Sequence, residues 1–234
     1  MVLKQSSSDK INGIVFAISY FSTIPLRTDS FEATKDFYKG VLYGLPIVGL
    51  LLAFLTIGLF LLLPYHPLYN AMLSGIFYLF LTGFLHFEAL CDTIDGWYAS
   101  YSNKDIYDVM HEPQVGSIGA LGGVTFLILL LSSLVYALYL QAYWAVLISF
   151  ILSRVSVFFA LEFEFHEKSS FLRSLKESHS SSIVFDTVLY PLKKAVRYIL
   201  STLKKRLGFL NGDTIGAMIV IIEVILLNLM LLFA

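Results

Sequence analysis

Charged residues are scarce in this chain of 234 residues. Asp, Glu, Lys and Arg together make up 14% of it, whereas about 25% is usual in soluble domains. Hydrophobic residues make up 57%. A soluble protein of this length leaves about a third of its unfolded-chain surface in water and cannot hide so much apolar area. The composition excludes a soluble enzyme, a disordered chain and a coiled coil, and it predicts a membrane protein.

The chain has only one cysteine, and its positive charge is not in surplus. The single cysteine, Cys91, excludes an internal disulfide and a cysteine-rich zinc site. The 16 Lys and Arg residues are balanced by 17 Asp and Glu residues, so the chain lacks the basic surplus that attracts nucleic acid. We therefore expect membrane lipid and small molecules as partners, and no nucleic acid.

Long apolar runs, by contrast, are present. A membrane-spanning helix needs about 20 apolar residues, and five stretches qualify: 41–63, 68–90, 119–140, 142–161 and 215–233. Ile11–Leu26 is shorter and interrupted by polar residues, and is predicted to be an interfacial or re-entrant helix. The expected fold class is an all-α polytopic membrane helix bundle of five to six spans, with residues 1–234 as a single integral membrane domain.

Lysine and arginine predict the orientation of the spans. They occur in every second connection, at 27–39, 91–118 and 162–214. The turns at 64–67 and around Gln141 carry none. Because cytoplasmic loops retain Lys and Arg, the polar segments and the active site are expected to face the cytoplasm from the cell (inner) membrane, with the C-terminus outside.

One basic segment has its own pattern. Residues 183–207 carry apolar side chains at steps of three and four, which predicts an amphipathic basic helix. Such a helix lies on anionic lipid or, alternatively, packs on the other helices. The Ser-rich stretch 169–182 before it is predicted to be a flexible tether.

Six of the 17 acidic residues are concentrated in one stretch of 25 residues. They are Glu88, Asp92, Asp95, Asp105, Asp108 and Glu112. On a helix, the first three share one face. Carboxylates crowded in this way repel one another unless a cation offsets their charge, and oxygen ligands suit a hard ion such as Mg²⁺. The cluster therefore predicts a Mg²⁺ site for phosphoryl transfer, and the alternative is a solvated acidic loop.

Four further residues are candidates for contact with a substrate. Arg154 lies inside an apolar span, where it either faces a partner acid such as Glu223 or reaches a substrate phosphate. His86 is a ligand contact or a hydrogen-bonded structural histidine. Gly116 opens a span with small residues, which let a helix or a phosphate approach the backbone. Asp213 either caps the last span or binds substrate.

These residues lie in motifs that resemble a known family. Residues 86–96 (HFEALCDTIDG) resemble H-x-D-G-L-A-D-T-x-D-G, residues 110–119 (MHEPQVGSIG) resemble M-R-D-S-R-x-G-T-x-G, and residues 212–217 (GDTIGA) resemble G-D-T-L-G-A. A Ser153-Arg154 pair and the later Glu223 also match. In this order the motifs are similar to those of the adenosylcobinamide-GDP ribazoletransferase family, also called cobalamin 5′-phosphate synthases.

The resemblance implies the last assembly step of vitamin B12 synthesis. A hydroxyl of ribazole, or of ribazole 5′-phosphate, attacks the cobinamide-linked phosphorus of adenosylcobinamide-GDP, and GMP leaves in a reaction that requires Mg²⁺. A similar metal-binding pattern in CDP-alcohol phosphotransferases implies roles for the acids. Asp92, Asp95 and Asp108 would be metal ligands, Glu88 a ligand or support, and Glu112 a ligand or general base. The catalytic candidates are Asp108 and Glu112; the substrate-binding candidates are His86, Gly116, Arg154 and Asp213.

The chain departs from the family pattern at several positions, and two alternatives stay open. Family aspartates appear as Glu88 and Glu112, and family arginines as His111 and Gln114. A CDP-alcohol phosphotransferase of phospholipid synthesis is one alternative, although Ser100 stands where that class has arginine. A cation transporter is the other, although its polar groups would lie nearer mid-membrane. A homo-oligomer, or a complex with other enzymes of the corrinoid pathway, also stays open.

Overall fold

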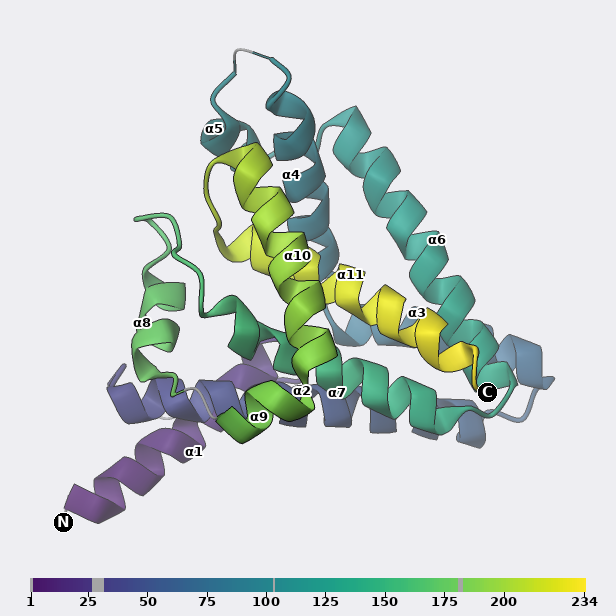
Figure 1. The fold of residues 1–234 in the computed structure, drawn as a ribbon. Helices are drawn as coiled ribbons and strands as arrows, with labels where there is room; N and C mark the ends of the chain where they lie inside the picture. Colours follow the sequence, from purple (N-terminus) through teal and green to yellow (C-terminus); the bar gives the residue numbers. More distant parts are fainter. Residues whose placement is uncertain (1, 27–31, 103, 181–182) are drawn as a thin grey trace.

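A computed structural model describes residues 2–26, 32–102, 104–180 and 183–234, and all regular secondary structure in these ranges is α-helical (Figure 1). The helices are α1 (Val2–Tyr20), α2 (Lys35–Leu62), α3 (Pro67–Leu81), α4 (Leu85–Ala99), α5 (Ile106–Met110), α6 (Ser117–Tyr139), α7 (Tyr143–Ala160), α8 (Ser170–Ser178), α9 (Ile183–Val188), α10 (Tyr190–Leu207) and α11 (Gly212–Leu231). The predicted all-α class is confirmed.

Among these helices, α2, α6, α7 and α11 are each long and apolar enough to cross a membrane. The bent pair of α3 and α4 makes a fifth candidate span. Large apolar side chains on these helices face outward: Phe54, Leu121 and Ile128 are 58%, 69% and 60% exposed. A hydrocarbon environment accommodates such a surface, and water does not. The predicted membrane helix bundle is confirmed with four to five candidate spans.

The prediction of one continuous helix over residues 68–90 is wrong. The chain ends α3 at Leu81, turns through Thr82–Phe84 and starts α4 at an angle of 76°. Gly83 and Phe84 both adopt φ near +59°, in the left-handed region that a right-handed helix cannot contain. Glycine takes this conformation readily. The break redirects α4, which carries the first three acids, away from the direction of α3.

A buried ion pair joins the two most enclosed spans, α7 and α11, each with 61% of its apolar window buried against 28% for α6. Arg154 on α7 pairs with Glu223 on α11, and each is 2% exposed. Tyr78 of α3 donates its hydroxyl to Glu223 and accepts a bond of 2.9 Å from the Arg154 guanidinium. Ser153 also donates to Glu223, at 3.0 Å. The structure thus favours the partner-acid alternative for Arg154.

The basic segment before α11 folds as two helices rather than one. The predicted helix over 183–207 is divided at Leu189 into α9 and α10, and Pro191 lies in the first turn of α10, where its missing N–H matters least. The apolar face of α10 is buried against the protein, with Leu192, Val196, Leu200, Leu203 and Leu207 all below 9% exposure. Its apolar face therefore packs on other helices, as in the second alternative.

The Ser-rich stretch is also more ordered than predicted. Residues 170–178 form α8, whose Leu172 and Leu175 are buried against the bundle. The tether prediction is wrong for this part because two leucines three residues apart place one face of a short helix in the core. Residues 181–182 lie outside the described residues.

At the N-terminus, α1 crosses α2 at very close range. A Cβ atom added to Gly13 would lie 2.1 Å from the Phe37 carbonyl oxygen, and one added to Gly40 would lie 2.1 Å from the Lys10 carbonyl oxygen. Two facing glycines let the backbones touch. Whether 11–26 lies in the membrane interface stays a prediction, and Arg27 of the first basic connection lies outside the described residues.

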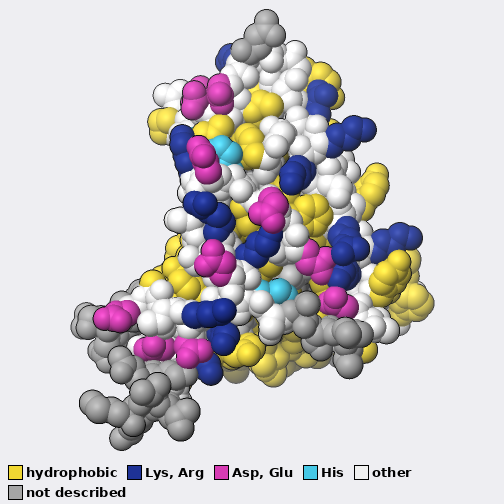
Figure 2. All heavy atoms as spheres, turned by 60° about the vertical axis from the view of Figure 1, so that its left-hand side comes forward, with side chains coloured by type: hydrophobic (Ala, Val, Ile, Leu, Met, Phe, Trp, Pro, Cys, Tyr) yellow, Lys and Arg dark blue, Asp and Glu magenta, His cyan; other side chains and the backbone are white. Residues whose placement is uncertain are grey.

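The two ends of the bundle differ in chemistry. The turns without basic residues and the end of α11 lie together: the Phe60 and Tyr143 rings are 6.0 Å apart, and Asn228 donates to Ser133 at 2.8 Å. The opposite end carries α5, α8 and the start of α11 (Figure 1). Figure 2 shows Lys, Arg, Asp and Glu side chains interspersed over that side of the molecule.

Candidate functional site

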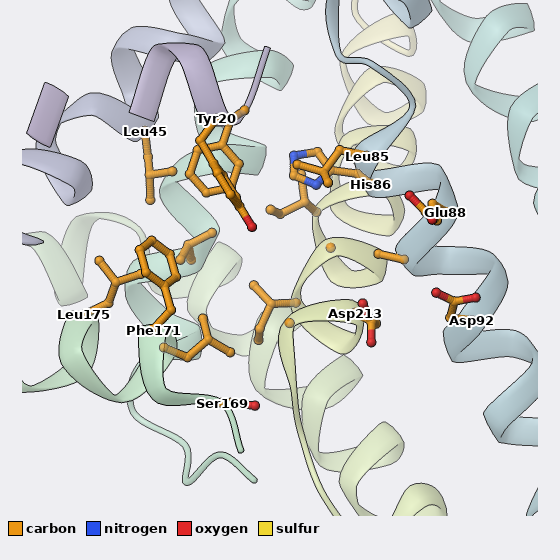
Figure 3. Close-up of a pocket in the computed structure, with 18 of the residues that line it drawn as sticks. Tyr20, Leu45, Leu85, His86, Glu88, Asp92, Ser169, Phe171, Leu175 and Asp213 are labelled. Atoms are coloured by element: carbon orange, nitrogen blue, oxygen red, sulfur yellow. The ribbon is translucent and has the colours of Figure 1, made fainter. Parts of the chain in front are cut away.

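A cavity of about 450 Å³ lies between the end of α1, helix α4, helix α8 and the start of α11 (Figure 3). We call it the first cavity. Helix α4 presents His86, Glu88 and Asp92 to it. On the other side, Asp213 belongs to the first turn of α11. The cavity thus collects side chains that lie more than 120 residues apart in the sequence.

Three carboxylates face the first cavity from two helices. Glu88 and Asp92 are four residues apart, so they share one face of α4. Asp213 comes to the same space because α4 and α11 pack closely, and a Cβ atom added to Gly216 would lie only 2.6 Å from the Ala89 Cβ. In Figure 3 the three carboxylates line one side of the cavity. The predicted metal residues Glu88 and Asp92 are therefore joined by Asp213.

Asp213 is not the cap of its helix. Asn211 holds that position: its side-chain oxygen accepts from the Thr214 N–H at 3.1 Å, and the Thr214 hydroxyl accepts from the Asn211 N–H at 2.9 Å. This reciprocal pair is a capping box. Asn211 also donates to Asp213 at 2.8 Å, which orients the carboxylate. The capping alternative for Asp213 is wrong, and its side chain is available to the cavity.

His86 is buried, 8% exposed, and lines the first cavity beside the three carboxylates. Its ring lies 6.0 Å from that of Phe21, which follows α1. A buried imidazole with one edge on a cavity can contact a substrate or simply hold the wall in place. Its predicted role in substrate binding stays a prediction.

Asp95 lies seven residues after Glu88, further along α4 and outside the first cavity, and it binds the start of α6. Its two carboxylate oxygens accept the backbone N–H groups of Gly116 and Gly119, each at 2.7 Å. The first N–H groups of a helix have no partner within it, and Gly116 at the N-cap has no side chain to supply one. A Cβ atom on Gly119 would lie 2.2 Å from Asp95. The small residues at Gly116 were predicted to let a helix or a phosphate approach the backbone, and in the structure the group that approaches it is the Asp95 carboxylate.

A second, more open cavity of about 360 Å³ lies beside Asp95 and is also lined by Lys104, Glu112 and Gly116. Asp108 lies on α5, is exposed and lines neither cavity. Asp105 caps α5 by accepting the Asp108 N–H at 3.1 Å. The acids that are clustered in sequence are thus divided among three places in the fold.

This division decides how a metal ion can be held. Across the described ranges, no three His, Cys, Asp or Glu side chains are close enough to hold a metal ion by themselves. The first cavity nevertheless offers three carboxylates, Glu88, Asp92 and Asp213, and carboxylate oxygens are the ligands that a hard cation prefers. Mg²⁺ commonly binds one or two protein carboxylates and takes its other ligands from phosphates and water. The residues at the first cavity fit that mode of binding.

Sequence reasoning missed the apolar wall of the first cavity. Tyr20, Phe21 and Phe171 line it, together with Leu175. They come from the end of α1 and from α8, which are separated by about 150 residues, and no spacing in the sequence connects them. The one available signal was the paired Leu172 and Leu175, which indicate a packed helix where a tether was expected.

Comparisons with known proteins agree with the motifs. The family model described as cobalamin-5-phosphate synthase matches residues 13–231. The adenosylcobinamide-GDP ribazoletransferase of Alkaliphilus oremlandii is 29% identical over 230 residues, which cover 89% of this chain and 92% of that protein. The protein of the same name from Desulfitobacterium hafniense is 30% identical over 237 residues, covering 90% and 93%. No solved structure matches. The chain belongs to the cobalamin-5-phosphate synthase family.

Proposed function

We infer that this protein is an adenosylcobinamide-GDP ribazoletransferase, which joins ribazole to adenosylcobinamide-GDP and releases GMP in the final step of cobalamin synthesis. The family match over residues 13–231 supports this function over the CDP-alcohol phosphotransferase and transporter alternatives. The structural observation that carries it is the convergence of Glu88, Asp92 and Asp213 on one cavity. Carboxylates placed in this way suit the transfer of a phosphate-linked group.

We propose that the reaction depends on Mg²⁺, with Asp92 and Asp213 as its protein ligands and Glu88 beside them. When bound there, the ion would neutralise the charge that develops on the phosphate oxygens. Asp95 would act by holding the start of α6 against α4, because both of its oxygens already accept backbone N–H groups. Asp108 and Glu112, predicted as ligands and catalytic groups, would lie outside this set.

The protein's own side chains then have to orient the acceptor hydroxyl and accept its proton. The acceptor hydroxyl forms a bond to the cobinamide-linked phosphorus, the bond from that phosphorus to the oxygen of GMP breaks, and the hydroxyl proton passes to a carboxylate. Glu88 lines the cavity beside the two proposed ligands and can take that proton. Glu112, predicted from the sequence as a metal ligand or general base, lines the second cavity instead.

We further propose that both cavities open to the cytoplasm from the inner membrane. They lie at the end of the bundle that carries α5, α8 and the basic helix α10. The last turn of α10 contains Lys204, Lys205 and Arg206. Segments rich in Lys and Arg stay on the cytoplasmic side of a membrane.

The test is direct. Purified protein in detergent, given Mg²⁺, adenosylcobinamide-GDP and ribazole, should release GMP, and EDTA should stop the reaction until Mg²⁺ is restored. Asp92→Asn should lower the rate about a hundredfold or more. Glu177→Gln, on the exposed face of α8, is the matched control and should keep the wild-type rate. Normal GMP release by Asp92→Asn would remove the metal site proposed here, and Glu112→Gln should retain activity if its carboxylate is not the base.

A further inference from the structure

One cationic side chain borders the first cavity. Among the described residues that line it, Lys168 is the only lysine or arginine. Ser169 and Ser170 follow Lys168 in the chain and also line the cavity, at the start of α8. Figure 3 shows Ser169 and Glu88 on different sides of this space. Besides its three carboxylates, the cavity therefore has an edge whose charge and hydroxyl groups suit an anion.

An aromatic stack determines where Lys168 lies. Its ammonium nitrogen is 4.5 Å from the centre of the Tyr107 ring on α5. The same ring stacks on His111 with 4.0 Å between ring centres and on His166 with 4.4 Å. A cation close to an aromatic ring is attracted by the negative face of that ring. Tyr107 thus holds the ammonium in one place although Lys168 is exposed.

The segment that contains Lys168 is also fixed to the start of α11. The Phe209 and His166 rings are 5.2 Å apart, and the His166 N–H donates to the Leu210 carbonyl at 2.8 Å. Lys168 follows His166 by two residues, and Asp213 follows Leu210 by three. These contacts explain how the lysine and one of the three carboxylates come to line the same cavity.

Lys168 has no carboxylate partner in the part of the chain that the structure describes. Two other lysines between α7 and α11 differ from it in this respect: Lys176 pairs with Glu164, and Lys193 pairs with Glu162 at 2.5 Å. An ammonium group has three N–H donors. Those of Lys168 are therefore available to an anion that enters the cavity.

The proposed reaction develops negative charge where GMP leaves. As the bond from the phosphorus to the oxygen of GMP breaks, its electron pair stays on that oxygen. The attacking and leaving oxygens of a phosphoryl transfer lie roughly in line, on opposite sides of the phosphorus. Glu88, which can take the proton of the attacking hydroxyl, belongs to α4, whereas Lys168 belongs to the wall before α8. A cation on that second wall can stabilise the leaving oxygen.

We propose that Lys168 is a catalytic residue whose ammonium donates a hydrogen bond to the leaving oxygen of GMP, and that Tyr107 is a positioning residue that holds the ammonium there. The proton of the acceptor hydroxyl passes to Glu88, the ammonium keeps its own protons, and GMP leaves as the phosphate anion. This assignment rests on the proposed function, which supplies GMP as the leaving group.

The first experiment compares Lys168→Gln with the control Lys194→Gln, which removes an exposed lysine of α10 that lines neither cavity. Lys168→Gln should lower kcat about a hundredfold, because the leaving oxygen loses a hydrogen bond from a cation. The KM for ribazole should stay within about twofold of wild type, because the ammonium does not contact the acceptor. Lys168→Arg keeps the charge and should recover most of the rate. Lys194→Gln should keep the wild-type kcat.

The same assay tests the positioning role of Tyr107. Tyr107→Phe keeps the ring and should keep the wild-type rate, whereas Tyr107→Leu should lower kcat about tenfold. Because Tyr107 acts through Lys168, Tyr107→Leu should cost little more when it is added to Lys168→Gln. An equal further loss in that background would overturn the positioning role.

The second experiment measures product binding without turnover. GMP and guanosine are titrated separately into full-length protein by calorimetry. Lys168→Gln should weaken the binding of GMP about tenfold and that of guanosine less than about twofold, since only GMP carries the phosphate. Equal weakening of both ligands would show a merely structural role and overturn the assignment. Failure of the wild-type protein to release GMP would overturn the proposed function, whereas normal release by both wild type and Lys168→Gln would overturn the role of the lysine alone.

Discussion

Arg154 and Glu223 form a buried ion pair, and replacing either residue alone leaves the other charge unpaired inside the protein. Each is a charge inside an apolar span, and each is acceptable there because the other lies beside it, with Tyr78 and Ser153 adding further hydrogen bonds. A lone charge in this environment is costly, whereas a matched pair removed together leaves no charge behind.

We therefore expect single and double substitutions to differ. Arg154→Leu or Glu223→Leu alone should lower the free energy of unfolding by about 3–5 kcal/mol, and the double substitution should lose clearly less. Thermal unfolding in detergent gives the comparison. The folded double variant should also release GMP, because Arg154 lines neither cavity; an inactive but stable double variant would show that Arg154 contacts the substrate after all.

The ion pairs of Glu162 predict that the stability of the protein depends on pH. It accepts from Lys193 at 2.5 Å and from Arg197 at 2.7 Å, linking the end of α7 to α10. Burial alone would raise the pKa of Glu162, but the hydrogen bonds from Lys193 and Arg197 outweigh it and hold the pKa below its ordinary value. Because the pKa of Glu162 is lower in the folded chain than in the unfolded chain, its ion pairs stabilise the fold fully at a pH above the unfolded-chain pKa of about 4.3. This stabilisation is lost as the pH falls through the folded-chain pKa.

Glu162→Gln should accordingly be less stable than wild type at pH 7, and the difference should shrink below about pH 4. Melting temperatures at pH 7 and pH 3.5 measure it. Glu177→Gln, exposed on α8, is the control and should show no such dependence. A difference that is the same at both pH values would contradict the assigned ion pair.

At the scale of the element, the break between α3 and α4 has the largest effect on the site. A continuous helix would have carried Glu88 and Asp92 along the direction of α3, away from Asp213. Hydropathy could not reveal the break, because Gly83 and Phe84 lie within an apolar run and their left-handed φ values leave no mark on composition. The helical spacing of Glu88, Asp92 and Asp95 was correct, but the neighbouring helices, α11 on one side and α6 on the other, decide where each acid points.

Two glycine substitutions test the break. Gly83→Ala should lower stability by about 1–2 kcal/mol, because alanine resists φ near +59° and its Cβ would lie 3.2 Å from Thr23. Activity should fall with it, since α4 shifts. Gly58→Ala on α2 is the matched control: nothing lies within 4 Å of the added atom, so stability should stay equal or rise by up to about 1 kcal/mol. Equal effects of the two changes would argue against strain at the break.

For the whole molecule, composition and apolar runs were sufficient to predict the class, and four of the five predicted spans appear as single helices. The family motifs led to Asp92, Asp213 and Arg154 because charges in or near apolar runs are conspicuous. The aromatic wall could not be found in this way, since Tyr20 and Phe171 meet only through the packing of α1 against α2 and of α8 onto both. Their contact is a property of the folded chain and has no local signature.

The orientation of the bundle can be measured with single cysteines in a Cys91→Ser background. Tyr65→Cys, in the turn without basic residues, should react with a membrane-impermeant maleimide on intact cells. Lys205→Cys, at the exposed end of α10, should react only after the membrane is made permeable. GMP release by each variant confirms a native fold. The reverse labelling pattern would place both cavities on the outer side.

The pairing of Arg154 with Glu223 also has a consequence in time. The two residues are 69 positions apart, and a ribosome adding about 5 to 20 residues per second needs about 3 to 14 s to reach the second after making the first. During that interval α7 carries a cation whose carboxylate does not yet exist. An unpaired arginine in a spanning helix is costly, so the centre of the bundle reaches its paired arrangement only when α11 arrives. A nascent chain stalled before residue 223 would expose an unpaired arginine, which offers membrane quality control a clear mark of incomplete synthesis.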